Sequence, residues 1–98
     1  MKIQHNREAD QLTVAVEGRL DTMTASEFEN TLDGMLSGVS LLVLDMTHLD
    51  YISSAGLRVL LKLQKKMLGQ GSMKLFGVNE IVMEVLEITG FSSILSIE

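Results

Sequence analysis

The sequence has 98 residues, which is enough for one domain with one hydrophobic core and too few for a second domain. Apolar residues make up 46% and charged residues 21%, as in soluble globular domains, and the net charge of −5 disfavours binding to nucleic acid or to anionic membranes. The chain has no cysteine, which excludes disulfides and thiolate metal sites. It also has no apolar run long enough for a membrane helix or a signal peptide, so we expect a cytoplasmic protein.

The first predicted elements form a β-hairpin. Residues 11–17 place Leu12, Val14 and Val16 on one side of the chain, and this period of two predicts a half-buried strand. A weaker strand is predicted over residues 2–5, and a polar break follows it. The two segments are therefore expected to pair.

A first helix is predicted after this hairpin. Thr24 and Glu27 have the spacing of a capping box, in which each side chain accepts a hydrogen bond from the backbone N–H of the other residue. Gly38 is expected to end the helix. Its apolar stripe consists of Phe28, Leu32, Met35 and Leu36.

A central strand and a second helix follow. Residues 41–44 are apolar at every position, as in a strand that other elements cover on both faces. The next helix is expected to end at Gly69, with three lysines exposed to solvent near its carboxyl end. Its expected apolar stripe consists of Leu57, Leu60, Leu61, Gln64 and Leu68.

The last part of the chain predicts a strand over residues 72–78 and a helix capped by Asn79. Residues 94–97 fit either a short edge strand or an extended tail. Because strands and helices alternate over most of the chain, parallel crossovers are expected, and the fold class is α/β with one mixed sheet. The expected apolar side of this last helix consists of Ile81, Val82, Val85, Leu86 and Thr89.

The junction between the central strand and the second helix is the candidate functional site, because open α/β sheets present their sites at such junctions. Ser53 or Ser54 can cap this helix, and a phosphate there would be stabilised by backbone N–H groups and the helix dipole. A serine cap is also common without any function. Asp21, at the end of a preceding strand, is expected nearby, and it can equally be a turn residue or a second cap.

Three segments together resemble the STAS domain of bacterial anti-sigma factor antagonists. They are residues 18–21 (Gly-Arg-Leu-Asp), 42–45 (Leu-Val-Leu-Asp) and 51–57 (Tyr-Ile-Ser-Ser-Ala-Gly-Leu), and their order and spacing cover nearly the whole chain. The resemblance implies a single STAS domain over residues 1–98. Its fold would be a mixed sheet of four or five strands with an N-terminal β-hairpin and three or four helices.

The resemblance also implies a function. In that family the hydroxyl residue two positions before the glycine of the Gly-Leu pair is phosphorylated by a serine kinase that is also the anti-sigma factor, and this position is Ser54. The best-known members have Asp before the acceptor, whereas this chain has Ser53, which remains an alternative acceptor. A PP2C-type phosphatase would reverse the modification. The expected partner-binding residues are Asp21, Thr22, Met23, Ser53, Ser54, Gly56, Leu57 and Arg58.

Other functions find less support in the sequence. No Gly-x-Ser-x-Gly elbow or suitably placed histidine predicts an enzyme, and no glycine-rich phosphate loop predicts a nucleotide site. His5 and His48 lie far apart, so neither a metal nor another cofactor is expected. One alternative stays open, namely a constitutive STAS scaffold or regulatory subunit of a signalling or transport complex that works without phosphorylation.

Overall fold

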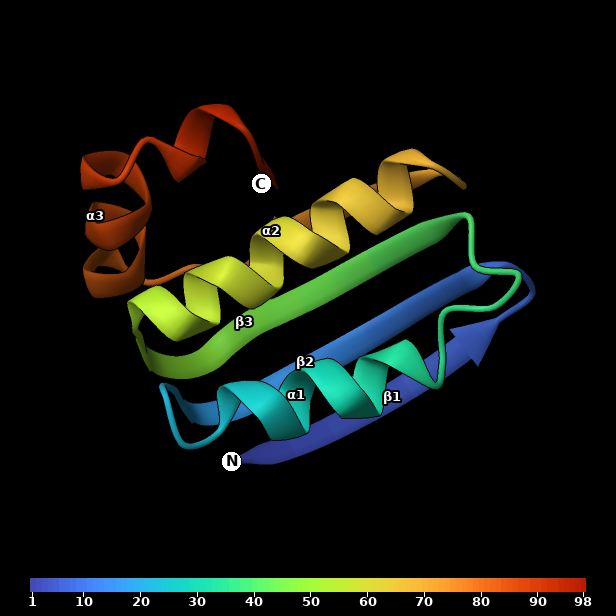
Figure 1. Cartoon of the computed structure of the whole chain (residues 1–98), viewed down its shortest axis with the longest axis horizontal. Helices are drawn as coiled ribbons and strands as arrows, with labels where there is room; N and C mark the ends of the chain where they lie inside the picture. The colour runs from blue at the N-terminus through green and yellow to red at the C-terminus, as the bar shows by residue number, and fades with distance from the viewer.

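Five strands form one mixed sheet in the computed structural model, which describes all 98 residues (Figure 1). β1 pairs with β2 in an antiparallel hairpin, as predicted, and every later strand lies parallel to the one before it. The strands therefore lie side by side in the order in which they occur in the sequence. Their bounds are Lys2–Glu8 for β1, Gln11–Leu20 for β2, Leu41–Ile52 for β3, Ser72–Phe76 for β4 and Ser96–Ile97 for β5.

Three α-helices connect the parallel strands: α1 (Ala25–Asp33), α2 (Ser54–Leu68) and α3 (Glu80–Ile88). Right-handed crossovers in a sheet of sequential order put all connecting helices on the same face. Figure 1 shows α1 and α2 lying along the strands and α3 at one end of the molecule. None of these helices combines the length and hydrophobicity needed to cross a bilayer.

The sequence correctly predicted a central strand, but its expected cover on both faces is wrong. Leu42 and Leu44 belong to the single core of 24 buried residues, which lies between the sheet and the helices. Leu41 and Val43 alternate with them on the face without helices; Leu41 is half-buried, and Val43 is buried but does not belong to this core. The strand also continues to Ile52, because its polar second half pairs with the end of β2.

Helix α1 is shorter than predicted and is capped differently. It ends at Asp33 with Gly34 as the C-cap, so Met35 and Leu36 follow the helix, although Leu36 remains buried. Thr24 is the N-cap residue, but its side chain makes no capping hydrogen bond. The predicted capping box with Glu27 is therefore absent, because the Thr24 hydroxyl bonds the preceding turn instead.

The buried side of α2 differs from the predicted stripe. Leu57 and Leu60 are buried as expected, and Gly69 is the C-cap. Leu68, however, is 67% exposed, and Leu63 and Met67 occupy the core positions farther along the helix. The predicted stripe is centred about 80° around the helix from the side that is buried, so only Leu57 and Leu60, at the shared edge, lie in the core.

The C-terminal elements follow the prediction with two changes. The Asn79 side chain caps α3 by accepting a hydrogen bond of 2.8 Å from the Val82 N–H, and residues 96–97 form an edge strand. Strand β4 ends at Phe76 instead of at residue 78. Ile81 is 61% exposed and does not belong to the buried side of α3.

Candidate functional site

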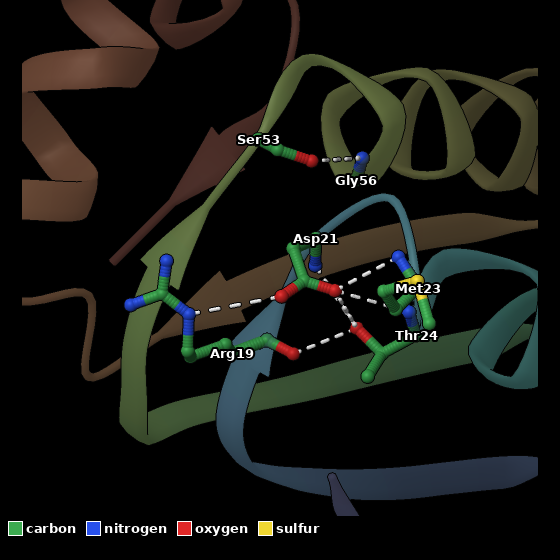
Figure 2. Close-up of polar contacts among 6 residues, drawn as sticks. All are labelled: Arg19, Asp21, Met23, Thr24, Ser53 and Gly56. Atoms are coloured by element: carbon green, nitrogen blue, oxygen red, sulfur yellow. Dashed lines mark hydrogen bonds and ion pairs between the residues drawn. The ribbon is translucent and has the colours of Figure 1, made fainter.

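The ends of β2 and β3 meet at the candidate site. Leu20 pairs with Ile52, and the N–H of Ser53 donates a hydrogen bond of 2.9 Å to the carbonyl oxygen of Leu20. Asp21 and Ser54 therefore follow neighbouring strand ends that are joined through the backbone. The structure thus brings the two predicted segments to the same edge of the sheet, as Figure 2 shows for Asp21 and Ser53.

The two serines at the start of α2 have different roles. Ser53 is the N-cap, with extended backbone angles, and its Oγ accepts a long hydrogen bond of 3.4 Å from the Gly56 N–H (Figure 2). Ser54 is the first residue of the helix; it is exposed, and its hydroxyl makes no hydrogen bond within the chain. The sequence left the choice of cap open, and the structure assigns it to Ser53.

The first turn of α2 packs closely on the end of β2. Gly56 is buried against Leu20 and Ile52. Leu57 is also buried, with 5% of its surface exposed. Both residues hold the helix against the sheet, and the expectation that they also contact a partner stays a prediction.

Asp21 organises the turn between β2 and α1. Its Oδ1 accepts hydrogen bonds from the N–H of Met23 at 3.0 Å and from the N–H of Thr24 at 3.1 Å (Figure 2). The backbone hydrogen bond from Thr24 is the main cause that lowers the pKa of Asp21, with desolvation opposing it and the Met23 N–H adding to it. Asp21 is therefore a turn residue, and it also places a carboxylate at the site.

The Thr24 hydroxyl completes this turn. It donates a hydrogen bond of 2.7 Å to the carbonyl oxygen of Arg19 and accepts one of 2.9 Å from the N–H of Asp21. The predicted capping box gives the Thr24 hydroxyl a different bond, so this role of Thr24 was not predicted from the sequence. The Asp-x-x-Thr spacing of residues 21–24 was the available signal.

Arg19 forms a second contact that the sequence did not reveal. Its Nε lies 3.7 Å from Oδ2 of Asp21, and its guanidinium lies 4.4 Å from the centre of the Tyr51 ring. Arg19 and Tyr51 are direct neighbours in the β2–β3 register. This pairing depends on two register shifts in β2 and β3, so residue spacing alone could not predict it.

The remaining predicted contact residues lie at the surface. Thr22 is exposed and Met23 is 87% exposed. Arg58 is exposed and belongs to no ion pair. Beside it, a shallow groove separates α1 from α2, and the sequence did not predict it; its lining residues are Thr22, Ala25, Ser26, Glu29, Ala55, Arg58, Val59 and Lys62.

Comparisons with known proteins identify the family. The STAS domain family model matches residues 1–98. The chain is 38% identical over 96 residues to BtrV of Bordetella bronchiseptica, which is assigned as an anti-sigma factor antagonist; the match covers 96% of this chain and 83% of BtrV. It is 30% identical over 95 residues to the anti-sigma-B factor antagonist of Listeria monocytogenes, covering 94% and 82% of the two chains.

Solved structures agree with this assignment at the level of the fold. The anti-sigma factor antagonist SpoIIAA in its unphosphorylated form superposes with a TM-score of 0.85 at 14% identity, covering 99% of this chain and 88% of SpoIIAA. Bacillus SpoIIAA in its phosphorylated form gives a TM-score of 0.75 at 13% identity, covering 99% and 91%. Because the family model spans the whole sequence, the chain belongs to the STAS domain family.

Proposed function

We propose that this chain is an anti-sigma factor antagonist whose binding to its partner is switched off by phosphorylation of Ser54. Its relatives BtrV and the Listeria protein carry the name of anti-sigma factor antagonist. The observation that carries the choice of residue is the contrast between the two serines. The Ser54 hydroxyl is exposed and unbonded, whereas the Ser53 hydroxyl is the helix cap and is half-buried.

The unmodified surface of the switch would consist of two neighbouring segments. The turn after β2 contributes the carboxylate of Asp21 and the exposed side chains of Thr22 and Met23. Helix α2 contributes the hydroxyl of Ser54 and the unpaired guanidinium of Arg58. The hydrogen bond between the Ser53 N–H and the Leu20 carbonyl oxygen fixes the relative position of these segments.

Phosphorylation would change the charge of this surface without unfolding it. A phosphate adds roughly −1.5 to −2 charges, which the amino end of α2 stabilises through its N–H groups and dipole. The same charge repels Asp21 and any acidic group of a bound partner. A loss of ~3 kcal/mol in binding free energy weakens an affinity more than a hundredfold.

The proposed partner is a serine kinase that is also an anti-sigma factor, and a PP2C-type phosphatase would restore the unmodified protein. In this scheme the chain binds the kinase and thereby releases the protein that the kinase holds. The chain itself performs no catalytic step.

A modification experiment tests the acceptor. Wild type, Ser54→Ala and Ser53→Ala are incubated with ATP and each serine kinase of the host, and intact mass and peptide mapping locate the phosphate. One phosphate on Ser54, present in wild type and in Ser53→Ala but absent from Ser54→Ala, is expected. If no host kinase modifies the protein, the constitutive scaffold becomes the better explanation.

A binding experiment tests the switch with the kinase identified in this way. Ser54→Asp should lose at least tenfold in affinity by calorimetry, whereas Ser54→Ala should bind like the wild type. Ser72→Asp provides the matched control, because Ser72 is an exposed serine where β4 begins, at the opposite end of the parallel strands. Full affinity of Ser54→Asp, or an equal loss in Ser72→Asp, would contradict the proposed switch.

A further inference from the structure

Helix α3 exposes a stripe of apolar side chains. Ile81 is 61% exposed, Ile88 is 78% exposed, and the half-buried Val85 lies between them. These positions are i, i+4 and i+7 of one helix, so the three side chains lie in a row about 10 Å long on one side. We call these three residues the α3 stripe. The adjacent side of α3, about 100° around the helix from the stripe, is anchored in the core by Val82 and Leu86.

Three glutamates lie along one edge of the α3 stripe. Glu80, Glu84 and Glu87 have the same i, i+4, i+7 spacing, and all three are exposed. None of them belongs to an ion pair, and the chain has no lysine or arginine after Lys74. This face therefore combines apolar surface with negative charge that the chain itself does not neutralise.

Hydrogen bonds of Asn79 attach the start of α3 to the sheet. The side chain of Asn79 caps the helix and also donates a hydrogen bond of 2.8 Å from Nδ2 to the carbonyl oxygen of Leu49 in β3. Leu49 lies four residues before Ser53, so α3 is attached near the strand end that carries the proposed switch. Figure 1 shows α3 at the same end of the molecule as the start of α2.

We propose that the α3 stripe is a docking surface for an amphipathic helix of a protein partner that has lysine or arginine along one edge of its apolar face. The apolar row would bury the partner's apolar side chains, and the glutamates would pair with its cations and fix its orientation. Anionic lipid and nucleic acid do not fit this face, because the glutamates repel both. Docking here does not depend on phosphorylation of Ser54.

Leu68 provides a contrast. It is 67% exposed on α2, with Lys65 one turn before it, and the apolar residue two turns before it, Leu61, is only half-buried, so no pair of exposed apolar side chains forms a row there. Single exposed leucines of this kind are ordinary features of soluble proteins. Leu68→Ser is therefore a control that removes a similar exposed apolar area from another helix.

Two synthetic helical peptides test the docking surface. Both peptides are two heptads long, with leucine at the a and d positions of each heptad. One peptide carries lysine along one edge of this apolar face, and the other carries glutamate at the same positions. Binding to the full chain is followed by ¹⁵N chemical shifts. The lysine peptide should shift the amides of α3 and bind at least tenfold more tightly than the glutamate peptide, by an amount that falls with added salt.

Variants of the chain complete the test. Ile88→Ser should weaken binding of the lysine peptide at least tenfold, whereas Leu68→Ser should leave the affinity for this peptide unchanged. Glu84→Lys should reduce the preference of the chain for the lysine peptide over the glutamate peptide. Chemical shifts elsewhere in the sheet verify that each variant is folded. Equal binding of the two peptides, or shifts confined to other helices, would overturn the proposal. So would self-association of the wild type that Ile88→Ser abolishes, because the occupant would then be a second copy of the chain.

Discussion

Gly56 packs so closely on Leu20 that a Cβ atom at position 56 would lie 2.8 Å from the Leu20 carbonyl oxygen. The backbone of the first turn of α2 therefore rests on the end of β2. This contact determines how far the start of α2 stands above the sheet edge, and with it the position of Ser54 relative to Asp21.

The first prediction concerns this contact. Gly56→Ala should destabilise the fold by about 1–2 kcal/mol in urea unfolding, because the clash outweighs the better helix propensity of alanine. Gly34→Ala is the control, since Gly34 has helical backbone angles and its Cβ would lie 3.8 Å from the nearest atom. That variant should be as stable as the wild type or slightly more stable. Equal stability of the two variants would show that α2 can move away from Leu20 at little cost.

The two serines should differ in stability as well as in function. Ser53→Ala removes the acceptor for the Gly56 N–H and should cost about 0.5–1 kcal/mol, near the lower end for N-caps because the bond is long. Ser54→Ala removes no hydrogen bond and should lie within about 0.5 kcal/mol of the wild type. Chemical denaturation of both variants checks this. A larger loss for Ser54→Ala than for Ser53→Ala would mean that the capping roles are reversed.

The third prediction is a pH dependence that originates in Asp21. Because its pKa is lower in the folded chain than the model-peptide value of 3.8, the group contributes stability above that value, and the contribution is lost as the pH falls through the lowered pKa. Asp21→Asn should therefore be less stable than the wild type at pH 7, and the difference should shrink below pH ~4. Urea unfolding between pH 3 and 7 measures it.

Asp50→Asn is the matched control for this titration. Asp50 is exposed and takes part in no ion pair or side-chain hydrogen bond. Its variant should be within about 0.5 kcal/mol of the wild type at pH 7, because it removes no contact of the folded chain. A constant difference between Asp21→Asn and the wild type at all pH values would show that the turn depends on carboxylate shape and not on charge.

The fourth prediction concerns the phosphorylated state. Arg58 lies four positions after Ser54 on α2, so the two are neighbours on its surface, and Arg58 has no competing ion pair. With phosphoserine incorporated genetically at position 54, the guanidinium should lower the second pKa of the phosphate, which is about 6 without such a partner. The ³¹P titration midpoint should therefore rise in Arg58→Gln and stay unchanged in Lys65→Gln. Identical midpoints in all three proteins would exclude this pair.

The fold was largely predictable because its signals are local. Alternation in residues 11–17 and the Asn79 cap each depend on neighbours within a few positions, and both appear in the structure. The end of α1 was not predictable from spacing, because Leu36 continues the helical period although the chain has already left the helix at Gly34. Tertiary packing buries Leu36 in the following loop, and periodicity cannot distinguish the two cases.

The candidate site was predictable in its location but not in its details. Strand order and the rule for parallel sheets were sufficient to bring Asp21 near the start of α2. Which of Ser53 and Ser54 caps the helix was not predictable, because both residues have the same chemistry. Only the hydrogen bond from the Ser53 N–H to the Leu20 carbonyl oxygen fixes which serine becomes the cap. Arg19 and Tyr51 meet through shifted strand register, which leaves no trace in residue spacing.

The sequential strand order has a consequence for how the chain is made. Every strand pairs with the one synthesised just before it, so no strand has to be inserted between two that are already paired. Each strand of a chain leaving the ribosome therefore emerges directly after the strand with which it pairs. Helix α3 and β5 emerge last, so the junction that carries Ser54 is outside the ribosome before the acidic helix beside it.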